Sequence, residues 1–230
     1  MRHIRSAAAG AVVAGYVLLQ LLGRRAGSTQ EERQRALPGD DVVPRPQIVT
    51  DHALTLEAAS VDIWPWLTQM GWHLGGYYTP IWVDRLLFRD NWPSLDNLDP
   101  ALVRDLDAGD IIPDGPPGTA WFVVEQADPP RSLVLHSTTH VPATWRERFG
   151  VSIDWTWSFQ VGDLPDSRAR VHLRVRGNMA PRWFAWNYQA LIVPADYVMA
   201  LGMLRGIAKR AETHTPPRPS GRIPYTRPQR

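Results

Sequence analysis

The sequence of 230 residues contains no cysteine. This absence excludes disulfide bonds, catalytic thiols, iron–sulfur clusters and zinc sites built from cysteine. Neither sign of charge dominates, because the formal net charge at pH 7 is only +2. Arginine outnumbers lysine 24 to 1, which we attribute to coding bias. Composition therefore indicates neither a thiol redox site nor a strongly basic protein.

Motifs of common catalytic chemistry are missing as well. The glycine-rich string at residues 71–78 lacks the preceding strand and following helix of a dinucleotide site, and no serine lies in a G-x-S-x-G elbow. The histidines do not assemble into three convergent metal ligands with supporting partners. We therefore expect no cofactor and no metal. The histidines are His3, His52, His73, His136, His140, His172 and His214.

What the chain does contain is enough apolar material for a folded domain. Apolar residues make up 44% and charged residues 21% of the sequence, which is typical of a globular protein. The length allows one domain of roughly 150–200 residues with tails. Eleven tryptophans are many for this length, and they are the first unusual feature.

An uncharged run at Ala7–Gly23 lies near the start of the chain, with arginines on both sides. At 1.5 Å per residue it spans about 25 Å, slightly less than a hydrocarbon core of about 30 Å. We predict that residues 1–27 form a single membrane anchor. A cleaved signal peptide is disfavoured because Arg24 and Arg25 lie where small residues belong. A helix packed on the domain is the other alternative. The basic residues after the run favour a cytoplasmic domain.

Two further segments have the composition of connecting or terminal chain. Residues 28–46 mix charge with proline and glycine, so we predict a linker there. Residues 213–230 contain five prolines and four arginines without an acidic residue, which predicts a disordered basic tail. Nothing pairs this tail with an aromatic stacking surface, so we expect no nucleic-acid partner. The folded domain is then expected at residues 47–212.

The central pattern predicts a strand at 48–58 and two short helices at 61–70 and 80–88, followed by an antiparallel meander. A long amphipathic helix comes last, and Pro194 is expected to break it into two pieces. The predicted fold class is α+β, with an antiparallel curved sheet around a long C-terminal helix and an N-terminal hydrophobic helix. The meander strands are predicted at residues 110–113, 120–126, 132–138, 151–161 and 169–176.

Several strings within residues 37–212 resemble the START-like or helix-grip (SRPBCC) superfamily, which includes Bet v 1-like and polyketide cyclase/dehydrase-like proteins. The resemblance is closer to one uncharacterised bacterial branch. It implies a helix-grip fold and says little about activity, because members bind lipids, sterols and polyketides and only some catalyse reactions. The matching strings are Leu37–Asp40, Trp64–Gly71, Gly75–Trp82, Gly109–Gly115, Trp157–Phe159 and Met203–Glu212.

A curved sheet that holds one helix usually leaves a cavity between them, and aromatic residues cluster on the elements expected around it. Any single ring is more often core than ligand-binding, but so many indoles favour a cavity over a filled core. Buried rings supply large contact areas, and methionines supply adaptable apolar walls. We predict that the ligand-binding residues are Tyr77, Tyr78, Trp82, Trp121, Trp157, Met199 and Met203.

Three functions stay open at this stage. The favoured one is binding of a hydrophobic or amphipathic small molecule, lipid-like or polyketide-like, near a membrane. The first alternative is a cyclase/dehydrase-like enzyme that uses acid–base residues in the cavity. The second is a structural or interaction protein whose cavity is filled by its own side chains. The strand residues weighed for acid–base chemistry are Glu125, His136, Asp154, His172 and Arg174, of which Asp154 is expected to pair with His172 or Arg174 on the outer face.

Overall fold

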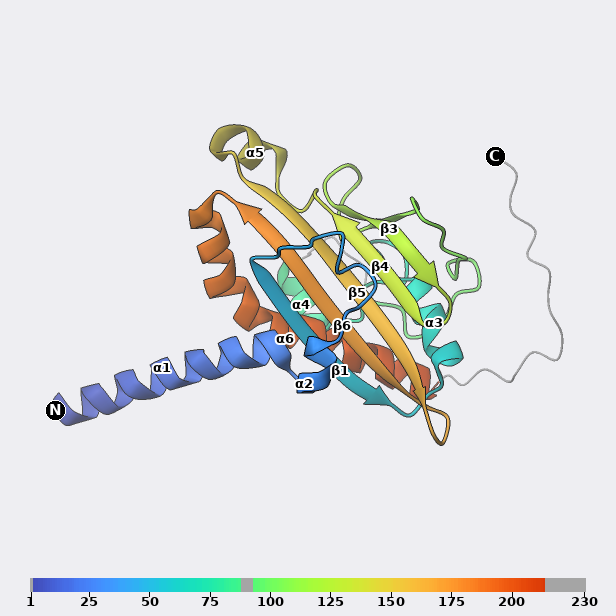
Figure 1. Ribbon diagram of the computed structural model, residues 1–230, viewed down its shortest axis with the longest axis horizontal. Coiled ribbons are helices and arrows are strands. Elements are labelled where there is room, and N and C mark those ends of the chain that lie inside the picture. The colour runs from blue at the N-terminus through green and yellow to red at the C-terminus, as the bar shows by residue number, and fades with distance from the viewer. Residues whose placement is uncertain (1, 88–92, 214–230) are drawn as a thin grey trace.

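The computed structural model in Figure 1 describes residues 2–87 and 93–213, and describes side chains at residues 10–86 and 93–213. Residues 214–230, which make up nearly all of the predicted basic tail, lie outside the described residues. Six antiparallel strands form one sheet in the order β1-β6-β5-β4-β3-β2. Their bounds are β1 Ile48–Leu56, β2 Ile111–Pro113, β3 Trp121–Asp128, β4 Ser132–Ser137, β5 Ser152–Leu164 and β6 Arg168–Ala180.

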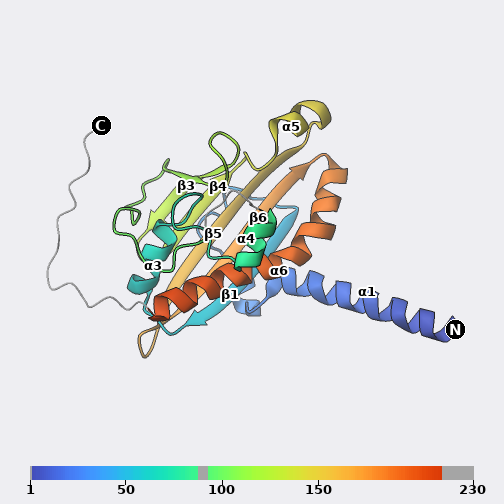
Figure 2. The same cartoon turned by 180° about the vertical axis from the view of Figure 1, so that it is seen from behind.

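The helices gather mainly on one face of this sheet (Figure 2). The last helix crosses that face, and its buried residues Met203, Leu204 and Ile207 join Phe159 and Leu173 of the sheet in the main core. The α+β fold class predicted from the sequence is therefore confirmed. The helices are α1 Arg2–Arg25, α2 Gln30–Gln34, α3 Ser60–Thr68, α4 Ile81–Leu87, α5 Ala143–Phe149 and α6 Arg182–Thr213.

Helix α6 contradicts one expectation, because Pro194 lies inside it without ending it. The two halves of α6 run in different directions (Figure 2), as a proline that lacks an N–H and crowds the preceding turn would cause. Proline cannot bond the carbonyl four residues earlier, and that carbonyl, of Ala190, accepts a hydrogen bond from the Tyr16 hydroxyl at 2.9 Å. Gln20 donates to the Gln189 carbonyl at 2.8 Å. Helix α1 thus satisfies backbone groups at the bend.

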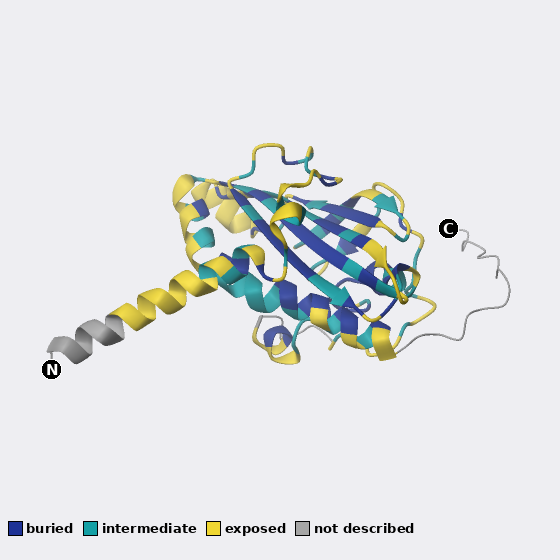
Figure 3. Cartoon of the chain, turned by 60° about the horizontal axis from the view of Figure 1, so that its bottom comes forward, coloured by how far each residue is buried: buried dark blue, intermediate teal, exposed yellow. Residues whose placement is uncertain are grey.

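Helix α1 has two parts with different surroundings. Its end packs on α6 so closely that a Cβ atom on Gly23 would lie 1.8 Å from the Val193 carbonyl oxygen. The preceding turns project from the domain and are exposed to solvent (Figure 3), with Val12 72% and Val13 62% exposed. The N-terminal helix predicted from the hydrophobic run is thus present, and its exposed residues 10–19 are uncharged and mostly apolar.

By length and composition, α6 is the one helix within the described residues that is apolar enough to cross a membrane, and a third of its most apolar stretch is buried in the protein. Because its second half fills the core between the sheet and α3, we interpret α6 as a core helix.

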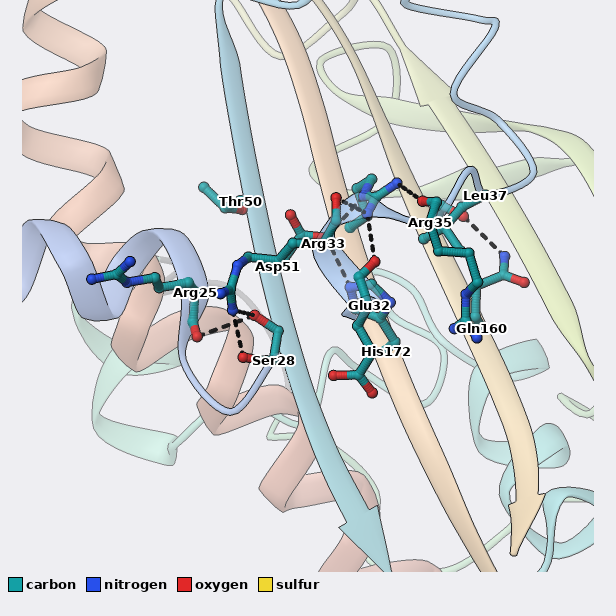
Figure 4. A network of polar contacts seen from close by, with 12 residues as sticks. Arg25, Ser28, Glu32, Arg33, Arg35, Leu37, Thr50, Asp51, Gln160 and His172 are labelled. Atoms are coloured by element: carbon teal, nitrogen blue, oxygen red, sulfur yellow. Dashed lines mark hydrogen bonds and ion pairs between the residues drawn. The ribbon is translucent and has the colours of Figure 1, made fainter. Parts of the chain in front are cut away.

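Residues 28–46, predicted as a linker, lie against the face of the sheet that α6 does not cover. Arg174 donates to the Asp51 carboxylate at 2.8 Å and to the Asp40 carboxylate at 2.9 Å. Figure 4 shows this outer-face network, in which His172 also contacts Asp51, at 2.8 Å. The segment therefore covers polar side chains that would otherwise face solvent, and its Val43 is buried.

The polar pairs on the outer face differ from those expected. Asp154 contacts His136 at 2.8 Å, and His136 also contacts Glu125 at 3.0 Å. His172 and Arg174 pair with Asp51 of β1 instead, because the β1–β6 register places that strand beside them. Helix α5, which the sequence reading missed, inserts between β4 and β5.

Candidate functional site

A cavity of about 280 Å³ lies between the sheet and α6. Its walls come from the inner faces of β5 and β6, from α6, and from the chain around residues 72–84. The lining residues are Trp72, Tyr77, Thr79, Val83, Asp84, Asp114, His140, Ile153, Trp155, Trp157, Leu173, Val175, Tyr188, Ile192, Asp196, Met199, Ala200 and Met203.

Aromatic rings make up much of this wall. Alternation along β5 places Trp155 and Trp157 on the inner face, with ring centroids 5.8 Å apart and planes at 71°. Tyr77 packs edge-on against Trp157 at 6.0 Å, and Tyr188 packs against Trp155 at 6.5 Å. Edge-to-face packing of this kind holds rings in fixed positions, so the cavity wall is largely preformed.

The aromatic turn before α4 is held against α6 by small residues. A Cβ atom on Gly206 would lie 2.0 Å from the Tyr78 carbonyl oxygen, and one on Gly202 would lie 2.7 Å from Pro80. Glycine at both positions lets the turn approach the helix backbone. Tyr78 adopts a positive φ of 57°, so its ring leaves the side on which Tyr77 lies. The Tyr78 hydroxyl donates to the Trp66 carbonyl at 2.9 Å, inside the core.

One polar group in the wall is the pair of Asp114 and His140. The Asp114 carboxylate lies 2.7 Å from His140 Nε2, while His140 Nδ1 contacts the Ser137 hydroxyl at 2.8 Å. The Trp155 indole N–H, which can only donate, lies 3.3 Å from the same Nδ1. Nδ1 is therefore the acceptor, and the proton sits on Nε2 and is donated to Asp114.

A second polar group lies on the opposite wall, where α6 meets β1. Asp196 Oδ2 accepts hydrogen bonds from the Thr50 hydroxyl at 2.9 Å and from His52 Nε2 at 3.0 Å. Burial raises the pKa of Tyr188 above its usual value, and the nearby Asp196 carboxylate raises it further. Burial, reinforced by Asp114, likewise raises the pKa of Tyr77. Both phenols are therefore neutral hydrogen-bonding groups at physiological pH.

Asp84 is the third carboxylate of the wall, on α4, and it accepts a hydrogen bond from the Thr79 hydroxyl. Burial is the main cause that raises its pKa. Among the described residues, no group of three histidine, aspartate or glutamate side chains is placed to hold a metal ion.

The predicted ligand-binding residues fall into two sets. Tyr77, Trp157, Met199 and Met203 line the cavity. The remaining three lie elsewhere: Tyr78 is buried in the core, Trp82 is 57% exposed on α4, and Trp121 borders a separate surface depression beside Trp72.

Sequence reasoning also left several wall residues unassigned. Trp155 shares a face with Trp157 by simple alternation, so the period of β5 could have identified it. Tyr188 lies on the first half of α6. Because the helix bends at Pro194, the periodicity of the second half does not predict which side of the first half faces the cavity. Asp114, His140 and Asp196 meet the cavity from distant parts of the chain, and no local pattern signals them.

The sheet order and the long helix across it define the helix-grip architecture. No family model and no curated protein matches the chain. Similar solved structures include truncated norcoclaurine synthase from Thalictrum flavum, at 13% identity and a TM-score of 0.41, over 73% of this chain and 95% of that one. CalU16 from Micromonospora echinospora is 15% identical with a TM-score of 0.33, over 72% and 84%. A hypothetical protein from Helicobacter pylori is 11% identical with a TM-score of 0.45, over 75% and 93%. These low values carry no argument about function.

Proposed function

We propose that this protein binds a small hydrophobic or amphipathic molecule in the cavity under α6, and that α1 holds the domain at a membrane. The observation that carries the proposal is the cavity itself, which stays open although five aromatic rings surround it. Binding sites for small molecules are typically concave, mostly apolar and largely preformed, with a few polar groups. The space between sheet and helix is not filled by side chains, which disfavours a purely structural role.

Burial of apolar surface would supply most of the binding energy, at about 25 cal/mol per Å². The volume of about 280 Å³ limits the part of the ligand that is enclosed to a small group. Ile192 lines the cavity and is also 40% exposed, so an entrance near this residue on α6 would connect the cavity with the surface. A chain that is longer than the cavity could leave through this entrance.

The membrane part of the proposal is supported by the exposed surface of α1. The helix has 24 residues, about 36 Å at 1.5 Å per residue, and its uncharged part, Ala7–Gly23, covers about 25 Å of a hydrocarbon core of about 30 Å. The projecting turns extend away from the domain (Figure 3), and their described apolar residues are exposed, including Val12, Val13 and Val17. Arg24 and Arg25 mark the domain end of the helix, and by the positive-inside tendency the domain would be cytoplasmic.

Native mass spectrometry of protein extracted gently from its source tests ligand binding. We expect a reproducible mass adduct that the Ala200→Phe variant loses, because the added ring fills the cavity from α6. The matched control, Val61→Phe, adds the same ring to an exposed position on α3 and should keep the adduct. A reproducibly empty wild-type protein, or an adduct that Ala200→Phe retains, would contradict the proposal.

Charge substitutions in α1 test the anchor without removing Ala26 and Gly27, which pair with β1. The double variant carries Val13→Asp and Leu18→Asp. In the middle of a membrane helix, each aspartate makes the free energy of insertion less favourable by about 2.5–3.5 kcal/mol. We expect this double variant to leave the membrane fraction. The control is Gln20→Asn, at a residue that contacts α6, and the protein with this substitution should stay membrane-bound. Wild-type protein that is released by salt alone would rule out an inserted helix.

Proton transfer on the bound molecule is a second candidate function, because Asp114 and His140 form an acid–base pair inside the wall. It is the weaker candidate because protein donors already occupy His140 Nδ1. Hydrogen–deuterium exchange at the carbon next to the carbonyl of 2-tetralone, followed by NMR, tests it. Exchange that is faster with wild-type protein than with His140→Gln would support it, and equal rates would exclude His140 as its base.

A further inference from the structure

The charged groups in the cavity wall are all of one sign. Asp84, Asp114 and Asp196 line the cavity, and among the described lining residues there is no lysine or arginine. Two arginines act on the wall from outside it: Arg210 attracts the charge of Asp84, and Arg104 acts electrostatically on the Tyr77 hydroxyl, which is neutral. Asp114 and Asp196 therefore depend on the histidines beside them for any compensation.

His140 does not compensate Asp114 with a positive charge. Its Nδ1 accepts from the Trp155 indole N–H, which can only donate, so a second N–H at this nitrogen would oppose that indole and break the hydrogen bond. Through Nε2, His140 orients the Asp114 carboxylate.

His52 does not compensate Asp196 either. Its side chain is fully buried, and its Nδ1 has no hydrogen-bond partner among the described residues. Protonation would bury a second N–H without an acceptor, which is unfavourable. Both hydrogen bonds to Asp196 fall on Oδ2, so within the described part of the chain Oδ1 has no partner and is available to a ligand.

Aromatic rings line the same cavity as these carboxylates. Trp155 and Trp157 stand nearly perpendicular to one another, and Tyr77 and Tyr188 extend the corner that they form. Faces of indole and phenol rings attract cations, and a quaternary ammonium group is the cation that such walls accommodate with least loss of hydration. An anionic ligand would meet negative charge and ring faces together.

We infer that the cavity selects a ligand whose enclosed end is an ammonium group, held between the carboxylates of Asp114 and Asp196 and the aromatic corner of Trp155 and Trp157. This inference rests on the proposed binding function and specifies its ligand class. The apolar remainder of the ligand would contact the methionines of α6 and the valine of β6 in the wall.

The test compares three probes of similar size on full-length protein in maltoside micelles: benzyltrimethylammonium, its uncharged isostere neopentylbenzene, and the anion 3-phenylpropionate. Quenching of the cavity tryptophans reports binding. We expect saturable binding of benzyltrimethylammonium. The affinity for 3-phenylpropionate should be at least about tenfold lower. Partition into micelles is the same for every variant and cancels when variants are compared.

The decisive variant carries Asp114→Asn together with Asp196→Asn. Each amide oxygen can still accept the hydrogen bonds of His140, Thr50 and His52, so the wall keeps its shape. We expect ammonium affinity to fall about tenfold or more and neopentylbenzene affinity to change less than about twofold. The control Asp154→Asn makes the same change on the outer face and should alter neither affinity. Retained binding of neopentylbenzene shows that the variant is folded.

The outcomes separate this inference from the proposed function. The inference is overturned if neopentylbenzene binds and the double variant lowers the affinity for benzyltrimethylammonium no more than the affinity for neopentylbenzene. The cavity would then be a neutral apolar site. An anion that binds as tightly as the ammonium also overturns it. If neither the isostere nor the ammonium saturates, the inference and the proposed function both fail.

Discussion

Strand β1 presents buried polar residues on both faces, and the two faces treat carboxylates differently. On the outer face Asp51 contacts Arg174 and His172, each at 2.8 Å. On the inner face the neighbouring residues Thr50 and His52 donate to Asp196. The outer carboxylate is neutralised by a guanidinium, whereas the inner one receives only hydrogen bonds. A carboxylate paired with a guanidinium, like that of Asp51, suits a structural contact. The carboxylate of Asp196, which only accepts hydrogen bonds, can still bind a cationic ligand.

The segment at residues 28–46 explains why charged side chains are stable when buried on the outer face. Arg174 donates to the carbonyls of Glu32, Arg33 and Arg35 as well as to two carboxylates, so its donors are satisfied. Burial of an ion pair is tolerated when remaining donors find partners. Among the described residues, no comparable segment covers the carboxylates of the cavity, and the space beside them is open.

The largest expected effect is on the outer face. Arg174→Ala leaves Asp51 buried without its guanidinium, so the free energy of unfolding should fall by about 3–5 kcal/mol. Denaturation followed by tryptophan fluorescence measures the change. Arg131→Ala removes an exposed ion pair with Asp128 and should not change the midpoint measurably. A loss for Arg174→Ala that is no larger than for the control would mean that the two faces do not differ in this way.

Next in size is the close contact that shapes the cavity. Gly206→Ala places a Cβ atom 2.0 Å from the Tyr78 carbonyl oxygen, so the turn must move away from α6. We expect a loss of about 1–3 kcal/mol of stability, as for other overpacked sites. Gly162→Ala, where nothing lies within 4 Å of the new Cβ atom, is the matched control in β5. Equal stability of both variants would show that the contact is looser than the structure indicates.

A smaller effect is expected for Asp196→Asn, because the amide oxygen keeps both hydrogen bonds and no cation loses its partner. The free energy of unfolding should change by less than about 1 kcal/mol. The same measurement on Asp51→Asn, which leaves Arg174 short of a carboxylate, should give a clearly larger loss. Similar losses for the two variants would remove the distinction between paired and unpaired carboxylates.

A further effect concerns the dependence of stability on pH in acid. Hydrogen bonding to Arg170 lowers the pKa of Glu32 from 4.5 to about 2 in the folded protein. Since the folded pKa is below the unfolded one, this stabilisation is complete above pH 4.5 and is lost as the pH falls from 4.5 to about 2. Glu32→Gln should flatten this part of the pH profile of thermal unfolding. Glu31→Gln, exposed on the same helix, should leave the profile as in wild type.

The hydrophobic run of α1 shows how a local pattern can have two roles. Its glycines and Gln20 weaken the preference of the run for lipid, which at sequence level favours the alternative of packing on the domain. In the structure Gln20 and Gly23 contact α6 at its bend, whereas the projecting turns carry valines. Gln20 and Gly23 thus belong to the docked end of the helix, whereas Gly10 and Gly15 lie with the valines in the projecting part proposed for the membrane.

Sequence periodicity determined most of the elements and the class of fold, because alternation in β5 and β6 and the apolar stripe of α6 are local properties. It also placed Trp157, Tyr77, Met199 and Met203 around one space. It could not indicate that Tyr78 lies in the core and away from this space, since a positive φ in the turn reverses the side on which the ring lies.

Only the tertiary structure decided which polar groups meet in the cavity. His140 reaches Asp114 across 26 positions of the chain, and Asp196 reaches Thr50 across 146. Such pairings depend on strand register, on the bend at Pro194 and on loop closure, which no window of sequence contains. Composition and periodicity therefore indicated an aromatic cavity under a helix, whereas long-range packing decided that the described residues of its wall include carboxylates and no lysine or arginine.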